Sequence, residues 1–232
     1  MRVASLAALL FLAAPAAACP PPGQWIDEAG QPVPERRALA RLAEAPVILL
    51  GERHGTPAHH RWQAEVVAAL ARRGPVVIGL EQLPPEAQPA LDRLVAGAIN
   101  LGAFRAESRW DELWGHDLEA YRPLFEVARA RAIPMVALNI DRAFVRRVGR
   151  AGYAAAAADG AAPVGRPAPA PAAYAETLAA SFRQHALAAG PEALARFIEA
   201  QTVWDRAMAE AIVRARIANP RARFVAITGW GH

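Results

Sequence analysis

The chain has 232 residues, of which 54% are hydrophobic, and a single cysteine, Cys19. This apolar fraction excludes wholesale disorder, and one cysteine excludes both an intramolecular disulfide framework and a cysteine-rich zinc cluster. The formal net charge is +4, but all 26 basic residues are arginines scattered among 22 acidic residues. Because no basic stripe with interleaved aromatic residues occurs, we expect no nucleic-acid partner.

Residues 1–18 have the pattern of a secretory signal peptide. Arg2 is followed by an apolar run from Val3 to Leu12, by Pro15, and by three alanines before Cys19. The apolar run is too short for a permanent membrane span. We therefore expect an exported protein, located in the periplasm or anchored at the cell envelope.

Cys19 follows the run of small residues directly, at the position where a bacterial lipoprotein is acylated after cleavage. Lipidation there would make Cys19 the one membrane anchor of the chain. The alternative is simple cleavage after Ala18, which leaves Cys19 as a free thiol or as half of a disulfide to another chain. The residues leave both alternatives open.

Four short apolar runs, at 47–50, 76–80, 135–138 and 224–227, predict buried parallel strands. Helical periodicity predicts helices around 62–70 and 118–128, and then over 175–189 and 191–218. The alternation predicts an α/β fold, with a mainly parallel sheet flanked by helices and an additional helical subdomain. The segment 151–173 is almost wholly Ala, Gly and Pro, so we expect it to bury little and to be flexible.

The ends of the predicted strands carry an unusual set of polar residues: Glu52, His54, Glu81, Asn139 and His232. The carboxyl ends of parallel strands form the edge at which ligands bind, so these residues are expected to converge in one pocket. Two imidazoles with carboxylates suit a divalent metal such as Zn, Mn or Fe, with His54 and His232 as ligands. Glu52 or Glu81 would then act as general base, or the same groups would act as acid and base without metal.

Other polar and aromatic residues have a structural interpretation beside a functional one. His59 and His60 open a predicted helix, where surface positions are the favoured interpretation. Gln201, in an apolar stripe, is either a core amide or a residue of the pocket. The arginines that follow the third predicted strand either form a solvated helix face or receive a carboxylate or propionate; they are Arg142, Arg146, Arg147 and Arg150.

Six motifs together resemble the ChaN family. They are Leu50-Gly51-Glu52-Arg53-His54, His60-x-Trp62-Gln63, Gly79-Leu80-Glu81-Gln82, Ala137-Leu138-Asn139, Ala200-Gln201-x-x-Trp204-Asp205-x-x-Met208-Ala209, and Gly229-Trp230-Gly231-His232. That family consists of bacterial, iron-regulated, haem-binding lipoproteins of the Tiki/TraB/erythromycin-esterase-like superfamily. The likeness covers nearly all of residues 19–232, which we interpret as one domain.

The resemblance implies haem as cofactor, bound between two subunits through a tyrosine, and a role in iron uptake by a homodimer. Tyr121, Tyr153 and Tyr174 are the tyrosines of the chain, and Tyr121 is favoured because Trp110 and Trp114 lie near it in the sequence. Some superfamily members are instead metal-dependent proteases or esterases, so a hydrolase is the alternative function. The chain stops inside the last motif, and we expect the natural protein to continue.

Overall fold

The computed structural model describes residues 20–158, 160, 162–185 and 190–231. The predicted signal peptide, Cys19 and His232 lie outside the described residues. The chain divides into two compact units, residues 1–38 and 39–232. In the described part of the first unit, Ile26 and Pro32 form an isolated antiparallel bridge, and the Asp27 carboxylate accepts two backbone hydrogen bonds in the turn between them.

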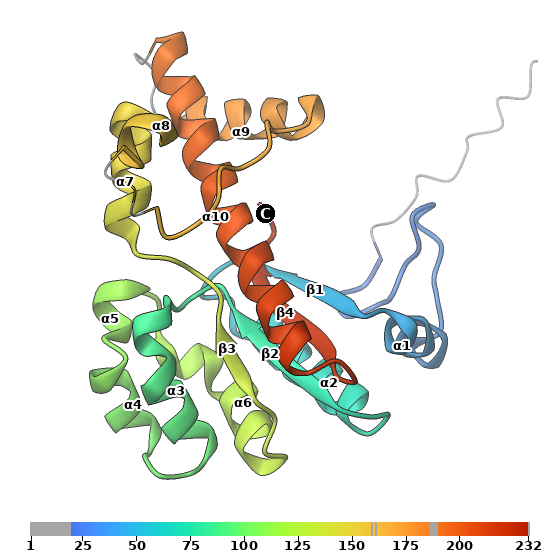
Figure 1. Cartoon of the computed structure of the whole chain (residues 1–232). Helices are drawn as coiled ribbons and strands as arrows, with labels where there is room; N and C mark the ends of the chain where they lie inside the picture. Colours follow the sequence, from blue (N-terminus) through green and yellow to red (C-terminus); the bar gives the residue numbers. More distant parts are fainter. Residues whose placement is uncertain (1–19, 159, 161, 186–189, 232) are drawn as a thin grey trace, which may run out of the picture. The chain divides into compact units, whose positions relative to one another are not determined.

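Four parallel strands form the sheet of the second unit (Figure 1). They are β1 (Val47–Glu52), β2 (Val76–Leu80), β3 (Met135–Ala137) and β4 (Arg223–Gly229), in the order β1-β4-β2-β3. The four predicted strands and the α/β fold class are confirmed. Since β4 lies between β1 and β2, the carboxyl ends of these three strands are neighbours.

The helices lie before, between and after the strands. Their bounds are α1 (Glu35–Glu44), α2 (Pro57–Ala71), the 3-10 helix η1 (Pro85–Ala87), α3 (Gln88–Val95), α4 (Leu101–Glu107), α5 (Trp110–Leu113), α6 (Leu118–Ala130), α7 (Arg142–Ala151), α8 (Tyr153–Ala156), α9 (Ala172–His185) and α10 (Pro191–Ala218). The predicted helices are confirmed as α2, α6, α9 and α10, except that residues 186–189 of the third prediction lie outside the described residues. None of the described helices has the length and apolar character needed to cross a membrane.

Helices α10 and α2 lie on opposite faces of the sheet (Figure 1). On one face, the small and apolar residues Met208, Ala211 and Ala215 of α10 pack against Phe224 and Ala226 of β4. On the other face, α2 contacts β1, β2 and α6. Burial on both faces explains why the strands are continuous apolar runs rather than alternating ones.

The edge of the sheet at β3 is covered by one side chain. The Gln88 side chain donates to the backbone oxygen of Met135 and accepts from the backbone N–H of Ala137. It therefore takes the place of a neighbouring strand at two of the three β3 residues, which protects an edge that would otherwise expose unpaired backbone groups.

Two of the described side chains of the Ala, Gly and Pro segment 151–173 are buried. The segment contains α8, and Tyr153 and Val164 are both buried in the cluster that α7 and α10 form. The Tyr153 hydroxyl donates to the backbone oxygen of Val164 at 2.7 Å. The expectation that this segment buries little is therefore wrong at these two positions, because each side chain finds a partner cluster that lies far away in the sequence.

Candidate functional site

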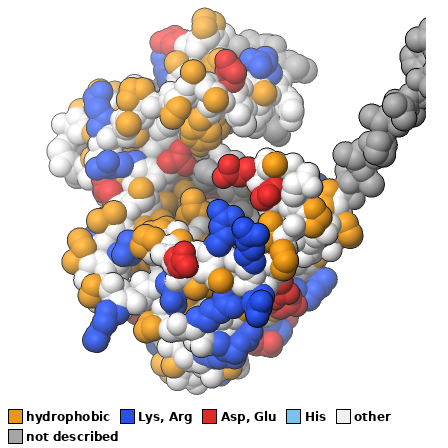
Figure 2. Space-filling view, turned by 90° about the vertical axis from the view of Figure 1, so that its right-hand side faces the viewer, with side chains coloured by type: hydrophobic (Ala, Val, Ile, Leu, Met, Phe, Trp, Pro, Cys, Tyr) orange, Lys and Arg blue, Asp and Glu red, His pale blue; other side chains and the backbone are white. Residues whose placement is uncertain are grey.

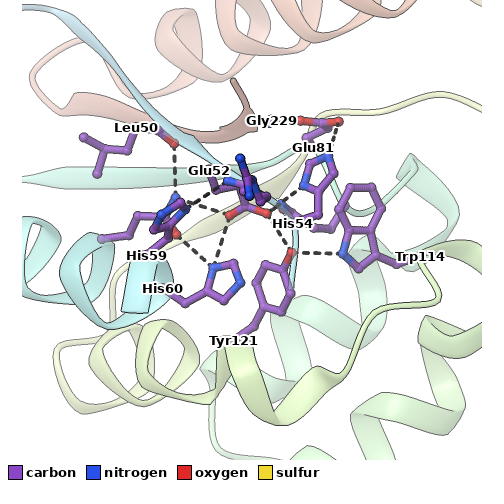
Figure 3. Close-up of polar contacts among 12 residues, drawn as sticks. Leu50, Glu52, His54, His59, His60, Glu81, Trp114, Tyr121 and Gly229 are labelled. Carbon is purple, nitrogen blue, oxygen red and sulfur yellow. Dashed lines mark hydrogen bonds and ion pairs between the residues drawn. The ribbon is translucent and has the colours of Figure 1, made fainter. Parts of the chain in front are cut away.

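The carboxylate of Glu52, the last residue of β1, is the centre of a buried polar network (Figure 3). Five side chains surround it with potential hydrogen-bond donors: His54, His60, Gln63, Gln82 and Tyr121. The shortest contact is the hydrogen bond that the Tyr121 hydroxyl donates to Oε1, at 2.6 Å. The ring Nδ1 of His54 lies 2.9 Å from the same oxygen. Glu52 is only 1% exposed. Both oxygens of its buried carboxylate therefore have hydrogen-bond partners.

This network decides the ionisation of Glu52. Burial alone raises the pKa of a carboxyl group, but the hydrogen bonds from His54, His60 and Tyr121 outweigh it and lower the pKa of Glu52 to about 2. Burial and the negative charge of Glu52 together raise the pKa of the Tyr121 hydroxyl well above its ordinary value. At neutral pH the pair is thus a carboxylate that accepts from a neutral phenol.

His54 lies between two glutamates. Its Nδ1 faces Glu52, and its Nε2 lies 3.8 Å from Oε1 of Glu81. The Trp114 ring meets the imidazole edge-on, with 4.5 Å between ring centroids, and the indole N–H of Trp114 donates to the Tyr121 hydroxyl. The His54 side chain is 31% exposed, so it is the part of this network that a ligand can reach from solvent.

Glu81 and Asn139 belong to the same edge of the sheet. The Glu81 carboxylate accepts from the backbone N–H of Gly229, the last residue of β4. The Asn139 amide donates to the backbone oxygen of Glu81 at 2.8 Å. The ends of β2, β3 and β4 are therefore linked by hydrogen bonds that run through Glu81.

Gly229 leaves no space for a side chain beside His54. A Cβ at position 229 would lie 2.8 Å from Nε2 of His54, well inside van der Waals contact. We expect Gly229→Ala to displace the imidazole from Glu52 and Glu81 and to lower the free energy of unfolding by about 1–3 kcal/mol, the usual cost of overpacking. Urea denaturation and the NMR shifts of the His54 ring measure both effects.

Gly231→Ala is the matched control, because a Cβ at Gly231 has no neighbour within 4 Å. It should leave stability and the His54 shifts unchanged. If the two alanine variants behave alike, the close packing of His54 on Gly229 is refuted.

The structure brings together most of the residues that the sequence placed in one pocket. Glu52, His54, Glu81 and Asn139 meet at the carboxyl ends of the strands, and Tyr121 joins them from α6. Gln201 lies half-buried on α10, and no recorded hydrogen bond of the described residues joins it to Glu52. Among those residues no group of three or more His, Cys, Asp or Glu could hold a metal ion. With His232 outside them, the metal site remains a prediction.

His60 is the main residue that the sequence interpretation placed wrongly. The surface interpretation holds for His59, which is exposed and accepts from the backbone N–H of Arg53. His60 instead is 0% exposed, stacks on the Tyr121 ring and lies 3.2 Å from Glu52. His60 and Gln63 lie one turn apart on the same face of α2, but this spacing alone does not indicate which face is buried.

Three further residues were not predicted as part of the site. Gln63 and Gln82 donate to the two oxygens of Glu52. His116 lies beside His54, with 5.5 Å between ring centroids. Burial lowers the pKa of His116, and positive charge at His54 acts in the same direction. Gln82 comes second after β2, next to Glu81, whereas Gln63 and His116 do not follow a strand.

Tyr174 on α9 contacts α10. Its hydroxyl donates to Oδ2 of Asp205 on α10 at 3.0 Å, and the residue is half-buried. Burial, the charge of Asp205 and the hydrogen bond to it raise the pKa of Tyr174, and the negative charge of Glu81 adds to this.

Comparison with known proteins identifies the fold and the family. The structure is similar to that of the Campylobacter jejuni ChaN protein described as showing cofacial haem binding, with a TM-score of 0.66 and 19% sequence identity over 87% of this chain and 76% of that chain. The type III effector HopBA1 is less similar, with a TM-score of 0.48 and 13% identity over 84% of this chain and 71% of that one. An erythromycin esterase in its open conformation has a TM-score of 0.46 and 14% identity over 84% of this chain and 63% of that one.

No curated protein matches the sequence significantly. Residues 38–232 match the family described as "Haem-binding uptake, Tiki superfamily, ChaN". That range contains the whole sheet and every residue of the Glu52 network. The resemblance inferred from the motifs is thereby confirmed, and the chain belongs to the ChaN family of the Tiki superfamily.

Proposed function

We propose that this chain binds haem and that Tyr174 is the ligand of the haem iron. The observation that carries the proposal is the hydrogen bond from the Tyr174 hydroxyl to Asp205, in a chain of a haem-binding family. The raised pKa keeps the Tyr174 phenol neutral in the free chain, and a tyrosine binds haem iron as phenolate, so its proton would leave only when the iron binds. Asp205, with Oδ2 at 3.0 Å from the hydroxyl, is in place to accept that proton.

The other two tyrosines suit this role less well. Tyr121 is 0% exposed, and its hydroxyl already donates to Glu52 and accepts from Trp114. Tyr153 is buried and donates to a backbone oxygen. Tyr174 is half-buried, so a ligand can approach its hydroxyl, which donates to Asp205. The chain's residues therefore fit a tyrosine-bound haem at Tyr174 rather than at Tyr121.

A planar macrocycle also needs an open, partly apolar surface. Figure 2 shows the surface hollowed near the middle of the face that it presents, with hydrophobic side chains in the hollow and both acidic and arginine side chains around it. Such a surface suits a ligand that combines an apolar ring with charged substituents.

Titration of the purified chain with ferric haem tests the proposal directly. We expect a shifted Soret band that saturates at a defined stoichiometry, and the absorption and EPR signature of ferric haem with an oxygen ligand. Haem added to buffer and to an unrelated protein of similar pI provides the background. A titration that never saturates would refute haem binding.

The alternative prediction, a metal-dependent hydrolase, is not favoured. The family is one of haem binding. The partly exposed imidazole of His54 lies 3.8 Å from the buried carboxylate of Glu81, but the carboxylate of Glu52 is already engaged in hydrogen bonds from Tyr121, Gln82 and Gln63.

We also propose that the protein is exported and acts in iron uptake as a homodimer that holds haem between its subunits. Support comes from the signal-peptide pattern of residues 1–18 and from the family's link to haem uptake. Mass spectrometry of the protein isolated from the cell envelope distinguishes a cleaved, lipidated Cys19 from a cleaved, unmodified one. Sedimentation with and without haem measures the oligomeric state.

A further inference from the structure

A pocket of about 200 Å³ lies beside the Glu52 network, at the carboxyl ends of β2 and β3. Gln82 and Asn139, which follow these strands, line it together with the arginines Arg109 and Arg142. We call it the Arg142 pocket. In a parallel sheet, this is the edge at which ligands bind, and Asn139 links the pocket to Glu81 through a 2.8 Å hydrogen bond.

The two arginines differ in how far their charge is already neutralised. Arg109 forms an ion pair with Glu112 three residues later. Arg142 is half-buried, and among the described residues the structure records no salt bridge for it. Half-buried arginines are favourable partners for carboxylates, because the guanidinium offers a planar pair of donors.

The position of Arg142 on α7 adds to the attraction for an anion. It is the first residue of this ten-residue helix, and Asp141 caps the helix by accepting from the backbone N–H of Ala143. The N-terminal end of a helix carries partial positive charge. Burial and the charge of His54 lower the pKa of the neighbouring His116, and the charge of Arg142 contributes in the same direction.

The other polar groups of the pocket define the orientation of a ligand. Glu86 and Asp141 also line it, but Glu86 is exposed and the Asp141 carboxylate is engaged in the helix cap. Oε1 of Gln82 is buried and has no hydrogen-bond partner, although Nε2 of the same amide donates to Glu52. Because this amide oxygen is an acceptor, it would take a donor such as a bound water and is not itself a partner for a carboxylate.

We propose that the Arg142 pocket binds a carboxylate, with Arg142 as its main partner. Two sources have this chemistry: a propionate group of haem and a free small carboxylic acid. The propionate form rests on the proposed haem binding, whereas the free-acid form does not. The pocket's volume accommodates a carboxylate and its alkyl stem but not a whole haem, so the macrocycle would lie outside it.

Haem and haem dimethyl ester distinguish the first source, because the ester lacks free carboxylates. We expect the wild-type chain to bind haem more tightly than the ester. Arg142→Gln should lose this preference, because loss of a charge-assisted hydrogen bond should weaken haem binding by about tenfold or more. Affinity for the ester should not change. Arg146→Gln is the matched control, since Arg146 is an exposed arginine of the same helix that does not line the pocket.

Glutarate without haem tests the second source by NMR shift titration of the Gln82 and Asn139 amides. Saturable shifts that Arg142→Gln abolishes and Arg146→Gln retains would support a pocket for a free carboxylate. Arg142-dependent preference for haem over its ester would support the propionate form. If Arg142→Gln changes neither the preference nor the glutarate shifts, the proposal is overturned. A wild-type chain that binds neither haem nor its ester refutes the proposed function, and the glutarate titration then decides the pocket alone.

Discussion

Tyr174→Phe will abolish the oxygen-ligand signature of the ferric haem complex and weaken haem binding by at least about 100-fold. Loss of a group that merely supports a metal ligand commonly costs 10–100-fold in metal affinity, so loss of the ligand itself should cost no less. The substitution removes one oxygen atom, and with it the hydrogen bond to Asp205 on α10. The Soret position, the EPR spectrum and the dissociation constant measure the result.

Tyr153→Phe is the matched control for this experiment. Its hydroxyl donates to the backbone oxygen of Val164 in a buried cluster, so its removal should cost about 1 kcal/mol of stability and leave the haem spectrum unchanged. Tyr121→Phe tests the remaining tyrosine. It removes a hydrogen-bond donor from Glu52, so it should lower the stability of the chain and leave the haem spectrum unchanged. An unchanged spectrum in Tyr174→Phe, with a changed one in Tyr121→Phe, would assign the ligand to Tyr121.

Much of the fold was predictable because each strand has a recognisable local sequence pattern. β2 is buried at all five positions, and a short continuous apolar run followed by polar residues is what such burial requires. The order β1-β4-β2-β3 was not predictable in the same way. It is set by contacts between residues that are far apart in the sequence. One of them is Phe224 of β4 beside Gly79 of β2, where a Cβ would lie 2.5 Å from the Phe224 ring.

The site was predictable where it depends on strand ends and not where it depends on helix packing. Glu52, His54 and Glu81 follow strands, so the topology of a parallel sheet brings them together. His59 and His60 are adjacent residues, yet only His60 is buried, because successive positions on a helix point about 100° apart. Which of the two faces the sheet depends on how α2 packs against β1 and α6, a contact that the sequence does not state.

The choice among the tyrosines required the same kind of information. Tyr121 is near Trp114 in the sequence, and the structure does join them by a hydrogen bond, but the shared partner is the buried carboxylate of Glu52. Tyr174 pairs with Asp205 across α9 and α10, two helices whose mutual position follows from packing alone. Aromatic residues close in sequence thus indicated a structural network, whereas the proposed ligand comes from a distant segment.

Glu52→Gln will destabilise the protein by about 3 kcal/mol at pH 7, the order expected when one partner of a buried charged network is removed. The amide has one acceptor oxygen in place of two, and its NH₂ group would face donors that now point at Glu52, such as Gln63 Nε2. Urea denaturation measures the change. Glu126→Gln, which removes an exposed carboxylate on α6, is the control and should stay within about 0.5 kcal/mol of wild type.

The same residue should govern the acid stability of the chain. The pKa of Glu52 is lowered to about 2 in the folded protein, while an unfolded glutamate has a pKa of about 4.3. A lowered folded-state pKa stabilises the protein above the unfolded pKa, and the benefit is lost as pH falls from about 5 to about 2. Over this window wild type and Glu126→Gln should lose about 3 kcal/mol through Glu52, whereas Glu52→Gln lacks that contribution. Equal acid sensitivity in Glu52→Gln and Glu126→Gln would mean that Glu52 is not held ionised by His54, His60 and Tyr121, and that the network is neutral instead.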